Sequence, residues 1–484
     1  MVRRPISLGA FIALGAIAAG CAVHEPGFDN PLTMPAAFIS DTDQPAAFSA
    51  ITPDRWWEAF GDTRLNELQS TALGDNFDLA TFRDRLTAAR AVVRRDRAPL
   101  LPSLDFSLLG EQSRRSDNDF RGEERFGASL IGVYEADIWR RNASVAEGAA
   151  LREAVAREQL VAAAISLSAD VARTWYALVE QRGQLGVLNA QIETNSDVLR
   201  VVELRFANGV VRASDVLRQK RLLESTFEQR AIVRANVEVL EHALLVLVGR
   251  SPTGSLNAAL DELPSAPPRP MLGLPSELVQ RRPDVRSALF AIRAADADVA
   301  AAVADRFPSV TFRAEASTLE ETIGDVFDNW AALLRVDVFG PVFDAGAREA
   351  EVDRAMAVKS ERVNAYAQTV LEAFGQVVDA ISRENGREEQ IVRIERQLGL
   401  ARRTSERLNR EYLNGDISYI DVLDALTTEQ QLQRDLLGAR FDRLGDRIDL
   451  YSALAGGWPG VVPSDEDEGA ARAEGGVSAA WGRG

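Results

Sequence analysis

The stretch LGVLNAQIETNSDVLRVVELRFANG, residues 185–209, decides the fold. It carries an apolar side chain every three or four residues, with one gap of seven, at Leu185, Leu188, Ile192, Leu199, Val202 and Phe206. A near-3.5-residue repeat flanked by charge predicts a helix that packs against other helices. Asn208 and Gly209 then close the stretch with residues typical of a helix end. A second helix is therefore expected to return and complete a hairpin.

The same pattern recurs 206 residues downstream, in the stretch that closes with Asn414 and Gly415. The images of the six apolar positions are Ile391, Ile394, Leu398, Ser405, Leu408 and Tyr412. At the same offset, LPSLDF at 101–106 recurs as FPSVTF at 307–312, and DVL at 215–217 recurs at 421–423. A single offset over such a distance indicates an internal duplication.

Proline is absent from two long tracts, residues 103–251 and 342–458. Because an interior proline costs a helix about 3 kcal/mol or more, such tracts can hold very long helices. The apolar rhythm extends over 141–206 and, in the second copy, over 344–412. At about 1.5 Å per residue, each helix would be roughly 100 Å long.

Ahead of each hairpin the apolar period changes to two. The alternation covers 104–108, 125–135, 309–317 and 334–338. It fits either transmembrane β-strands around an aqueous lumen or a soluble antiparallel sheet with one wet face, and periodicity does not separate the two. If the strands span a membrane, several chains must share the barrel, because four strands cannot close one and lipid does not tolerate an open edge.

The N-terminus has the pattern of an export signal with a lipid attachment site. Arg3 and Arg4 precede an apolar run, 6–19, which is followed by Gly20 and Cys21. This order of segments predicts a signal peptide over 1–20. The cysteine after the cleavage site resembles a bacterial lipobox, so Cys21 is expected to carry a diacylglycerol and an N-acyl chain. The alternative is an ordinary signal whose cysteine is incidental.

Composition excludes several classes of protein. The 484 residues carry a net charge of −17, which argues against nucleic acid as a partner. No run of 18 apolar residues occurs, so a helical membrane protein is excluded. Two histidines and one cysteine argue against zinc clusters, nucleophilic triads and disulfide frameworks. We therefore expect no metal, no cofactor other than the acyl chains on Cys21, and no catalytic residue.

Three motifs carry a resemblance to a known family: WWEAF at 56–60, RRPDV at 281–285 and VFGPVFD at 338–344. With them, nearly all of 21–460 resembles the TolC-like outer-membrane efflux proteins, in their NodT-type lipoprotein branch. One departure is Arg140 in DIWR at 137–140, where that family usually has glycine.

The resemblance implies a mainly α fold with a membrane β-barrel part. Two tandem repeats, each with a β-hairpin and a long helical hairpin, would form a trimeric 12-stranded β-barrel that continues into a periplasmic α-helical barrel. The expected segments are a lipidated equatorial segment (21–75), repeat 1 (76–250, with hairpins at 101–138 and 141–249), a Pro-rich linker (251–275), repeat 2 (276–456, with hairpins at 308–340 and 344–455) and a disordered tail (457–484).

The implied function is the exit duct of a tripartite efflux pump, which passes small molecules from the periplasm to the outside. The expected partners are two further copies of the chain, outer-membrane lipid, a periplasmic adaptor and an inner-membrane pump of the resistance-nodulation-division type. The alternative is a lipidated periplasmic adaptor or a structural coiled-coil protein of an envelope complex. An adaptor would need one hairpin flanked by lipoyl-like domains, whereas this sequence predicts two hairpins.

The resemblance also implies a gate at the hairpin tips, with the turns at Gly209 and Gly415 at the closed periplasmic end. The constriction carries over onto Ile420, Asp421 and Asp424, and the closing contact between hairpins onto Asp215 and Tyr412. The arginine of the family's gate falls on Ile417, so that part of the lock is missing or replaced. In a trimer the aspartates would form rings that draw cations. The alternative is a solvated helix face, with Asp215 and Asp421 supplying first-turn charge for the helix dipole.

Overall fold

The computed structural model describes residues 24–25, 27–28, 32, 55–114, 122–253, 262–270 and 275–454. The expected signal peptide, Cys21 and the tail from 457 lie outside these residues. The chain divides into two compact units, and the long helices α4 (Arg141–Ala207) and α8 (Ala347–Asn414) contribute to both. Among the described helices, none combines the length and the hydropathy that a membrane crossing requires.

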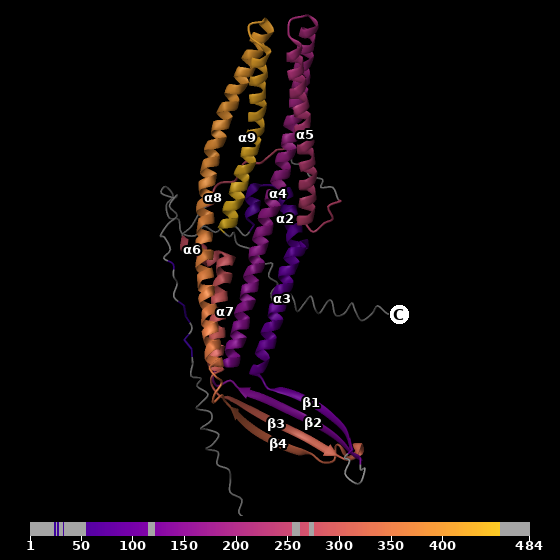
Figure 1. Cartoon of the computed structure of the whole chain (residues 1–484), viewed down its shortest axis with the longest axis vertical. Helices are drawn as coiled ribbons and strands as arrows, with labels where there is room; N and C mark the ends of the chain where they lie inside the picture. Colours follow the sequence, from indigo (N-terminus) through magenta and orange to yellow (C-terminus); the bar gives the residue numbers. More distant parts are fainter. Residues whose placement is uncertain are drawn as a thin grey trace, which may run out of the picture. The chain divides into compact units, whose positions relative to one another are not determined.

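The first unit contains an antiparallel sheet in which the strands follow one another in chain order (Figure 1). The strands are β1 (Ser103–Arg114), β2 (Gly122–Ala136), β3 (Ser309–Glu320) and β4 (Ala331–Phe339), with a short 3₁₀ turn, η3 (Ile323–Asp325), between the last two. The four strands lie where the period-two alternation predicted them.

The strand register gathers most of the apolar side chains of the sheet on one face, while the other face carries the charged pairs together with Leu109, Ile131, Val133, Leu319 and Leu333. Every pair in the register joins residues of equal parity, as in Phe106 with Leu130, Tyr134 with Phe312, and Phe312 with Val336. Since successive side chains point to opposite faces, even-numbered residues share one face across all four strands. That face carries Leu104, Phe106, Leu108, Ala128, Leu130, Tyr134, Val310, Phe312, Ala314, Ala316, Leu334, Val336 and Val338.

Helices α3 (Phe77–Arg97) and α7 (Pro283–Ala304) precede the two halves of the sheet, and a 3₁₀ turn, η2 (Ala98–Leu100), follows α3. Two ion pairs join α7 to the long helices within the first unit. Arg286 lies 2.7 Å from Glu158 of α4, and Lys359 of α8 lies 2.6 Å from Asp296.

Arg140 lies in the left-handed region, with φ of 62°, in the turn between β2 and α4. The residue 206 positions later is Gly346, with φ of 84°. Glycine adopts this conformation without strain, whereas an L side chain costs about 1–2 kcal/mol there. The departure from glycine noted in the sequence is therefore a strained residue.

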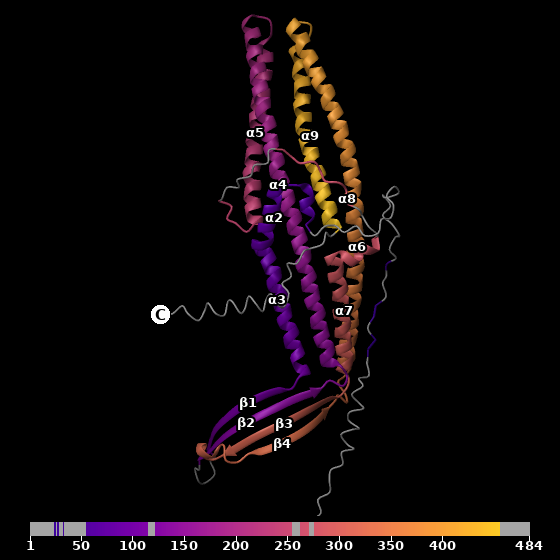
Figure 2. The ribbon, with the colours of Figure 1, turned by 180° about the vertical axis from the view of Figure 1, so that it is seen from behind.

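The second unit is built on two helical hairpins, α4 with α5 (Ala213–Leu247) and α8 with α9 (Tyr419–Ala453) (Figure 2). It also holds η1 (Trp56–Phe60), α2 (Thr63–Asp75) and α6 (Pro275–Arg281). Trp56 stacks on Tyr451 of α9 with ring centroids 5.6 Å apart. Asp62 caps α2 through one carboxylate oxygen and accepts the Trp175 indole N–H, 2.7 Å away, on the other.

The duplicated sequence pattern has a counterpart in the element boundaries. In the first copy, the elements start at residue 77 for α3, 103 for β1, 141 for α4 and 213 for α5. In the second copy, each start lies 206 residues later, at 283 for α7, 309 for β3, 347 for α8 and 419 for α9. The expected long helices at 141–206 and 344–412 are thus present within a few residues.

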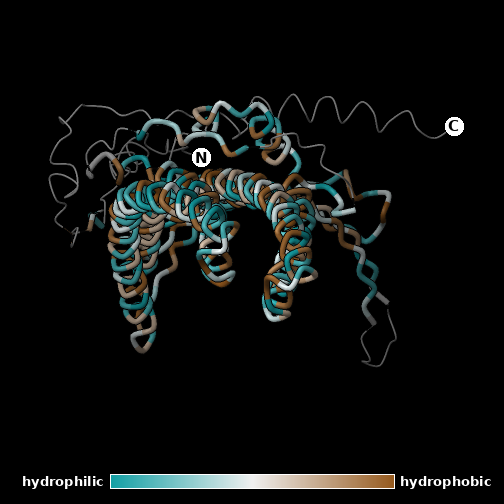
Figure 3. Tube along the Cα trace, turned by 90° about the horizontal axis from the view of Figure 1, so that it is seen from above, coloured by the Kyte–Doolittle hydropathy of each residue, from teal (hydrophilic) through white to brown (hydrophobic). Residues whose placement is uncertain are grey.

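The predicted apolar line on α4 is partly wrong. Figure 3 shows hydrophilic and hydrophobic residues interleaved along the helices. Leu188 and Val202 are fully buried, as predicted, but Phe206 is 47% exposed. Between the two buried apolar side chains the line continues through Gln191 and Asn195, which are 3% and 0% exposed. Counting apolar residues could not reveal these positions, because the buried side chains there are polar.

Candidate functional site

Both hairpin tips end in the same glycine-dependent turn. After α4, the Val210 N–H donates to the Arg205 carbonyl and the Gly209 N–H to the Phe206 carbonyl, at 2.9 Å each. After α8, the N–H groups of Asp416 and Gly415 make the matching bonds at 3.0 Å. This is the Schellman arrangement, which requires a left-handed residue, and Gly209 and Gly415 supply it with φ of 74° and 90°.

Asp215 and Asp421 occupy the third position of the returning helices. The Asp215 carboxylate accepts the Arg212 backbone N–H at 3.3 Å, and the Asp421 carboxylate accepts the Ser418 hydroxyl at 2.8 Å. Both place negative charge in the first turn, where the helix dipole favours it. Within one chain these aspartates therefore act as helix-terminal charges.

A buried cluster joins the two tips, and we call it the tip cluster. Its buried members are Val202, Tyr412, Tyr419, Val422 and Leu423, from α4, α8 and α9. The partly buried Ile417 packs against it. The position where the family's arginine would fall thus carries an apolar contact.

An arginine reaches the tip cluster from the other hairpin. The Arg205 guanidinium of α4 lies 4.5 Å from the centroid of the Tyr412 ring and donates to the Leu413 carbonyl at 3.3 Å. A cation over an aromatic face is attracted to the ring, more strongly where water is excluded. The contact therefore ties α4 to the end of α8, and the local sequence around Ile417 gave no sign of it.

The two tyrosines of the tip cluster differ in their hydroxyl groups. Tyr419 donates to the Gln219 side-chain oxygen of α5, whereas the Tyr412 hydroxyl is buried without a hydrogen-bond partner among the described residues. Burial raises the pKa of Tyr412, although the Arg205 cation opposes the shift. The predicted contact of Tyr412 with Asp215 is therefore not a hydrogen bond in this structure.

The predicted constriction residues lie on the opposite side of α9 from the tip cluster. Ile420 is 50% exposed, and Asp421 and Asp424 are exposed as well. Their neighbours along α9, Tyr419, Val422 and Leu423, are buried. Among the described residues, no group of acidic or histidine side chains could hold a metal ion. In one chain, Ile420, Asp421 and Asp424 thus form a surface open to solvent or to another copy.

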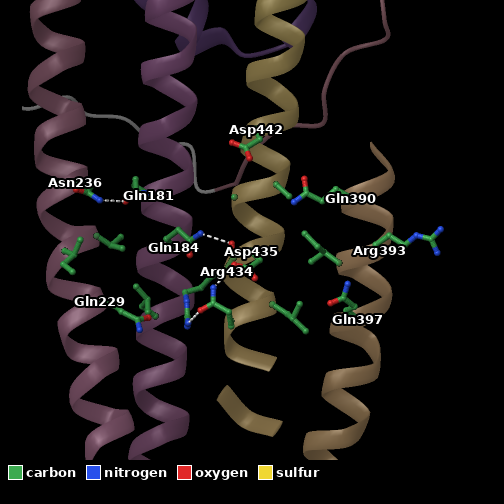
Figure 4. A pocket seen from close by; sticks show the side chains of 18 residues that line it. Gln181, Gln184, Gln229, Asn236, Gln390, Arg393, Gln397, Arg434, Asp435 and Asp442 are labelled. Atoms are coloured by element: carbon green, nitrogen blue, oxygen red, sulfur yellow. Dashed lines mark hydrogen bonds between the residues drawn. The ribbon is translucent and has the colours of Figure 1, made fainter. Parts of the chain in front are cut away.

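A groove of about 770 Å³ lies further along the hairpins and is lined by all four of their helices (Figure 4). Its lining is rich in amides: Gln181, Gln184, Gln229, Asn236, Gln390, Gln397 and Gln431. Behind it, the Gln191 amide donates to the Gln430 carbonyl and to the Gln433 side chain, at 3.0 Å each. In the sequence, Gln184, Gln191 and Asn195 have the same three-to-four-residue spacing as Leu188 and Val202, which places all five on one face of α4. That spacing was the sequence signal for this polar layer.

Comparison with known proteins identifies the class. The family model described as outer membrane efflux protein matches residues 68–250 and 274–456. The pyoverdine export outer membrane protein OpmQ of Pseudomonas aeruginosa is 29% identical over 417 residues, which cover 84% of this chain and 87% of OpmQ. The toluene efflux pump outer membrane protein TtgC of Pseudomonas putida is 29% identical over 424 residues, 84% of this chain and 86% of TtgC.

A solved structure shows the same fold. CusC, whose crystal structures concern transmembrane channel formation, aligns with a TM-score of 0.79 and 25% identity, covering 89% of this chain and 99% of CusC. The chain belongs to the outer membrane efflux protein family. It is an outer-membrane channel for efflux, and the family resemblance drawn from WWEAF, RRPDV and VFGPVFD is confirmed.

Proposed function

We propose that three copies of this chain form a closed duct, in which the sheets join into a membrane barrel and the helical hairpins form the tube on its periplasmic side. The observation that carries the proposal is the even-numbered apolar face. On it, Leu104, Leu334 and Val338 are 69%, 76% and 69% exposed. An apolar face of this extent on a sheet needs lipid or a partner against it. Three four-stranded sheets give 12 strands, within the range of bacterial barrels.

Aromatic side chains at both ends of the sheet support a membrane-spanning role. In the β3–β4 connection, Phe327 and Trp330 are 72% and 51% exposed. At the opposite end, Phe343, just after β4, is 89% exposed. Membrane barrels carry such aromatic girdles at the two interfaces. The same distribution argues against the soluble-sheet alternative, in which these rings would face water.

The polar face of the sheet suits an aqueous lumen. Arg313 pairs with Glu315 at 3.3 Å, and Arg335 with Asp337 at 2.8 Å. Both pairs lie on the odd-numbered face, opposite Phe312 and Leu334. Charged pairs of this kind are costly in lipid and ordinary in a water-filled pore.

The entrance of the proposed duct is the exposed side of α9 at its tip. Three copies would bring Ile420, Asp421 and Asp424 toward one axis, where they close the tube and form acidic rings. Such rings draw cations and oppose anions. The tip cluster would hold each chain's two hairpins together in the closed state, with the turns at Gly209 and Gly415 at the periplasmic end.

The proposed cargo is small molecules delivered by an inner-membrane pump of the resistance-nodulation-division type through a periplasmic adaptor. The relatives named for pyoverdine export and toluene efflux support such partners. The proposed activity is passage, so no residue is assigned a catalytic role. The two hairpins, with a family match that spans both, disfavour the adaptor alternative.

We further propose that Cys21 carries the lipid that anchors the N-terminus in the outer membrane. Support comes from the sequence alone, since Cys21 follows an export signal and is the only cysteine. Cys21→Ser should abolish acylation while leaving the trimer intact, because the barrel itself would anchor the protein. An unmodified Cys21 in the mass spectrum of the native N-terminus would contradict this.

The test is conductance in planar bilayers, together with a heat-sensitive trimer on a gel. Asp424→Asn should weaken block by trivalent cations added on the periplasmic side and lower cation selectivity. The matched control is Asp197→Asn, which removes one exposed carboxylate from α4 and should change neither. Absence of any channel would overturn the proposed duct. A channel whose block survives Asp424→Asn would overturn only the entrance assignment.

A further inference from the structure

Two buried amide side chains join the first hairpin to α9. Asn195 of α4 and Gln430 of α9 are 0% and 4% exposed. The Gln430 amide donates to the Asn195 side-chain oxygen at 2.9 Å, and the Asn195 amide donates back to Gln430 at 3.4 Å. Asn195 also donates to the Thr226 hydroxyl of α5 at 3.0 Å. The reciprocal amide pair thus joins α4 to α9 in a buried seam, and the Thr226 contact adds α5.

The pair is separable from its surroundings. Gln219 donates to the backbone carbonyl of Asn195, and Gln191 donates to the backbone carbonyl of Gln430. Thr226 donates its own proton to the Leu222 carbonyl. Replacing both amide side chains together would therefore leave no neighbouring donor orphaned.

The duplicated copy shows that packing does not demand amides here. The images of Asn195, Gln219 and Thr226 are Ala401, Ala425 and Leu432. In that copy α8 and α9 meet through an apolar cluster of Ile391, Ile394 and Ala439, with Leu432 and Leu436 packed against it. At the positions of the Asn195–Thr226 contact, the second copy therefore carries the apolar side chains of Ala401 and Leu432.

Amides and apolar side chains differ in what their separation costs. Exposing apolar surface to water costs free energy in proportion to the area exposed. A separated amide pair regains hydrogen bonds to water, so the net free energy lost on separation is small. The amide seam therefore holds one register while it is closed and parts at lower cost than an apolar seam. The α8–α9 seam instead combines the apolar cluster of Ile391, Ile394 and Ala439 with ion pairs such as Arg440–Glu395 at 3.0 Å, so it has more to lose on separation.

We propose that the Asn195–Gln430 pair is the release surface of the entrance, in that it sets how readily the α4–α5 hairpin separates from α9. Asn195 and Gln430 are positioning residues, since they set the free energy at which the tips part. This inference rests on the proposed gated duct and adds two buried residues that control its opening.

Opening can be followed at Val202, which is 0% exposed within the tip cluster. In full-length trimers carrying Val202→Cys, a maleimide can reach position 202 only when the tips part, and mass spectrometry separates this site from Cys21. Adding Asn195→Leu with Gln430→Met should slow labelling at 202 at least about tenfold. Asn195→Leu alone should speed it by a similar factor, because Gln430 is then buried without its partner.

Two controls separate a release role from general stability. Asn195→Gln with Gln430→Asn keeps both amides and should restore labelling to within about threefold. Asn189→Leu with Asn409→Leu removes two exposed amides from α4 and α8 that do not line the groove, and it should leave the rate unchanged. Thermal unfolding of each variant shows whether the trimer remains folded.

The outcomes are distinct. Wild-type or faster labelling in the folded Asn195→Leu, Gln430→Met variant would overturn the proposed release surface, whatever the conductance. A trimer that conducts no ions in bilayers, yet shows the expected labelling pattern, would overturn the proposed duct and leave the seam assignment standing.

Discussion

Arg205→Ala should loosen the closed entrance, because Arg205 ties the two hairpins of one chain together. Its guanidinium lies 4.5 Å from the Tyr412 ring centroid and 3.3 Å from the Leu413 carbonyl. A partly desolvated cation–π contact contributes about 1 kcal/mol. The hydrogen bond contributes about another 1 kcal/mol. Losing both weakens the closed state by roughly 2 kcal/mol per chain, which is about a 30-fold change in the opening equilibrium.

The assay is resting conductance of single trimers in planar bilayers without pump or adaptor, where Arg205→Ala should raise the open fraction at least about 30-fold, because all three chains carry the change. Arg205→Lys keeps the charge but loses the planar stack, so it should fall between wild type and Arg205→Ala. Tyr412→Phe should stay within about twofold of wild type, because the Tyr412 hydroxyl has no hydrogen-bond partner in the part of the chain that the structure describes. Arg200→Ala is the surface control. Wild-type conductance in Arg205→Ala, or equal leakage in Tyr412→Phe, would refute the reasoning.

Three further predictions concern the sheet and the long helices. Cysteine at Phe312 should react with lipid-soluble probes and cysteine at Arg313 with aqueous ones, and the reverse pattern would shift the strand register by one. Arg140→Gly should raise the free energy of unfolding by roughly 0.5–1 kcal/mol, as measured by thermal unfolding. The substitution removes the left-handed strain of Arg140, although glycine makes the unfolded chain more flexible. Destabilisation would mean that the arginine side chain makes a compensating contact. Burial raises the pKa of the Glu158 carboxyl from 4.5, although Arg286 opposes the shift. The stability that goes with the protonated form is therefore present below the unfolded value of 4.5 and is lost as pH rises through the folded pKa. Glu158→Gln should accordingly match wild type near pH 4 and gain on it toward pH 8, and parallel pH profiles would contradict this.

Local sequence determined the elements of this protein. The 3.5-residue rhythm placed the long helices, and the period of two placed the strands, because each pattern reports the geometry of the backbone that carries it. The turns at Gly209 and Gly415 followed in the same way, since a left-handed helix end favours glycine. The fixed offset of 206 residues further predicted that the helices and strands of the first copy recur in the second.

Tertiary structure decided which side chains meet. Asn195 and Gln430 are 235 residues apart, and nothing in the local spacing pairs them. The apolar periodicity instead predicted that Phe206 lies in the seam, but its side chain is 47% exposed. Arg205 reaches Tyr412 only because two hairpin tips lie side by side, so the arginine at the tips comes from α4, whereas position 417 carries isoleucine. Periodicity fixes the face that a residue occupies, whereas its partner depends on which helix packs against that face, and only the assembled chain determines that.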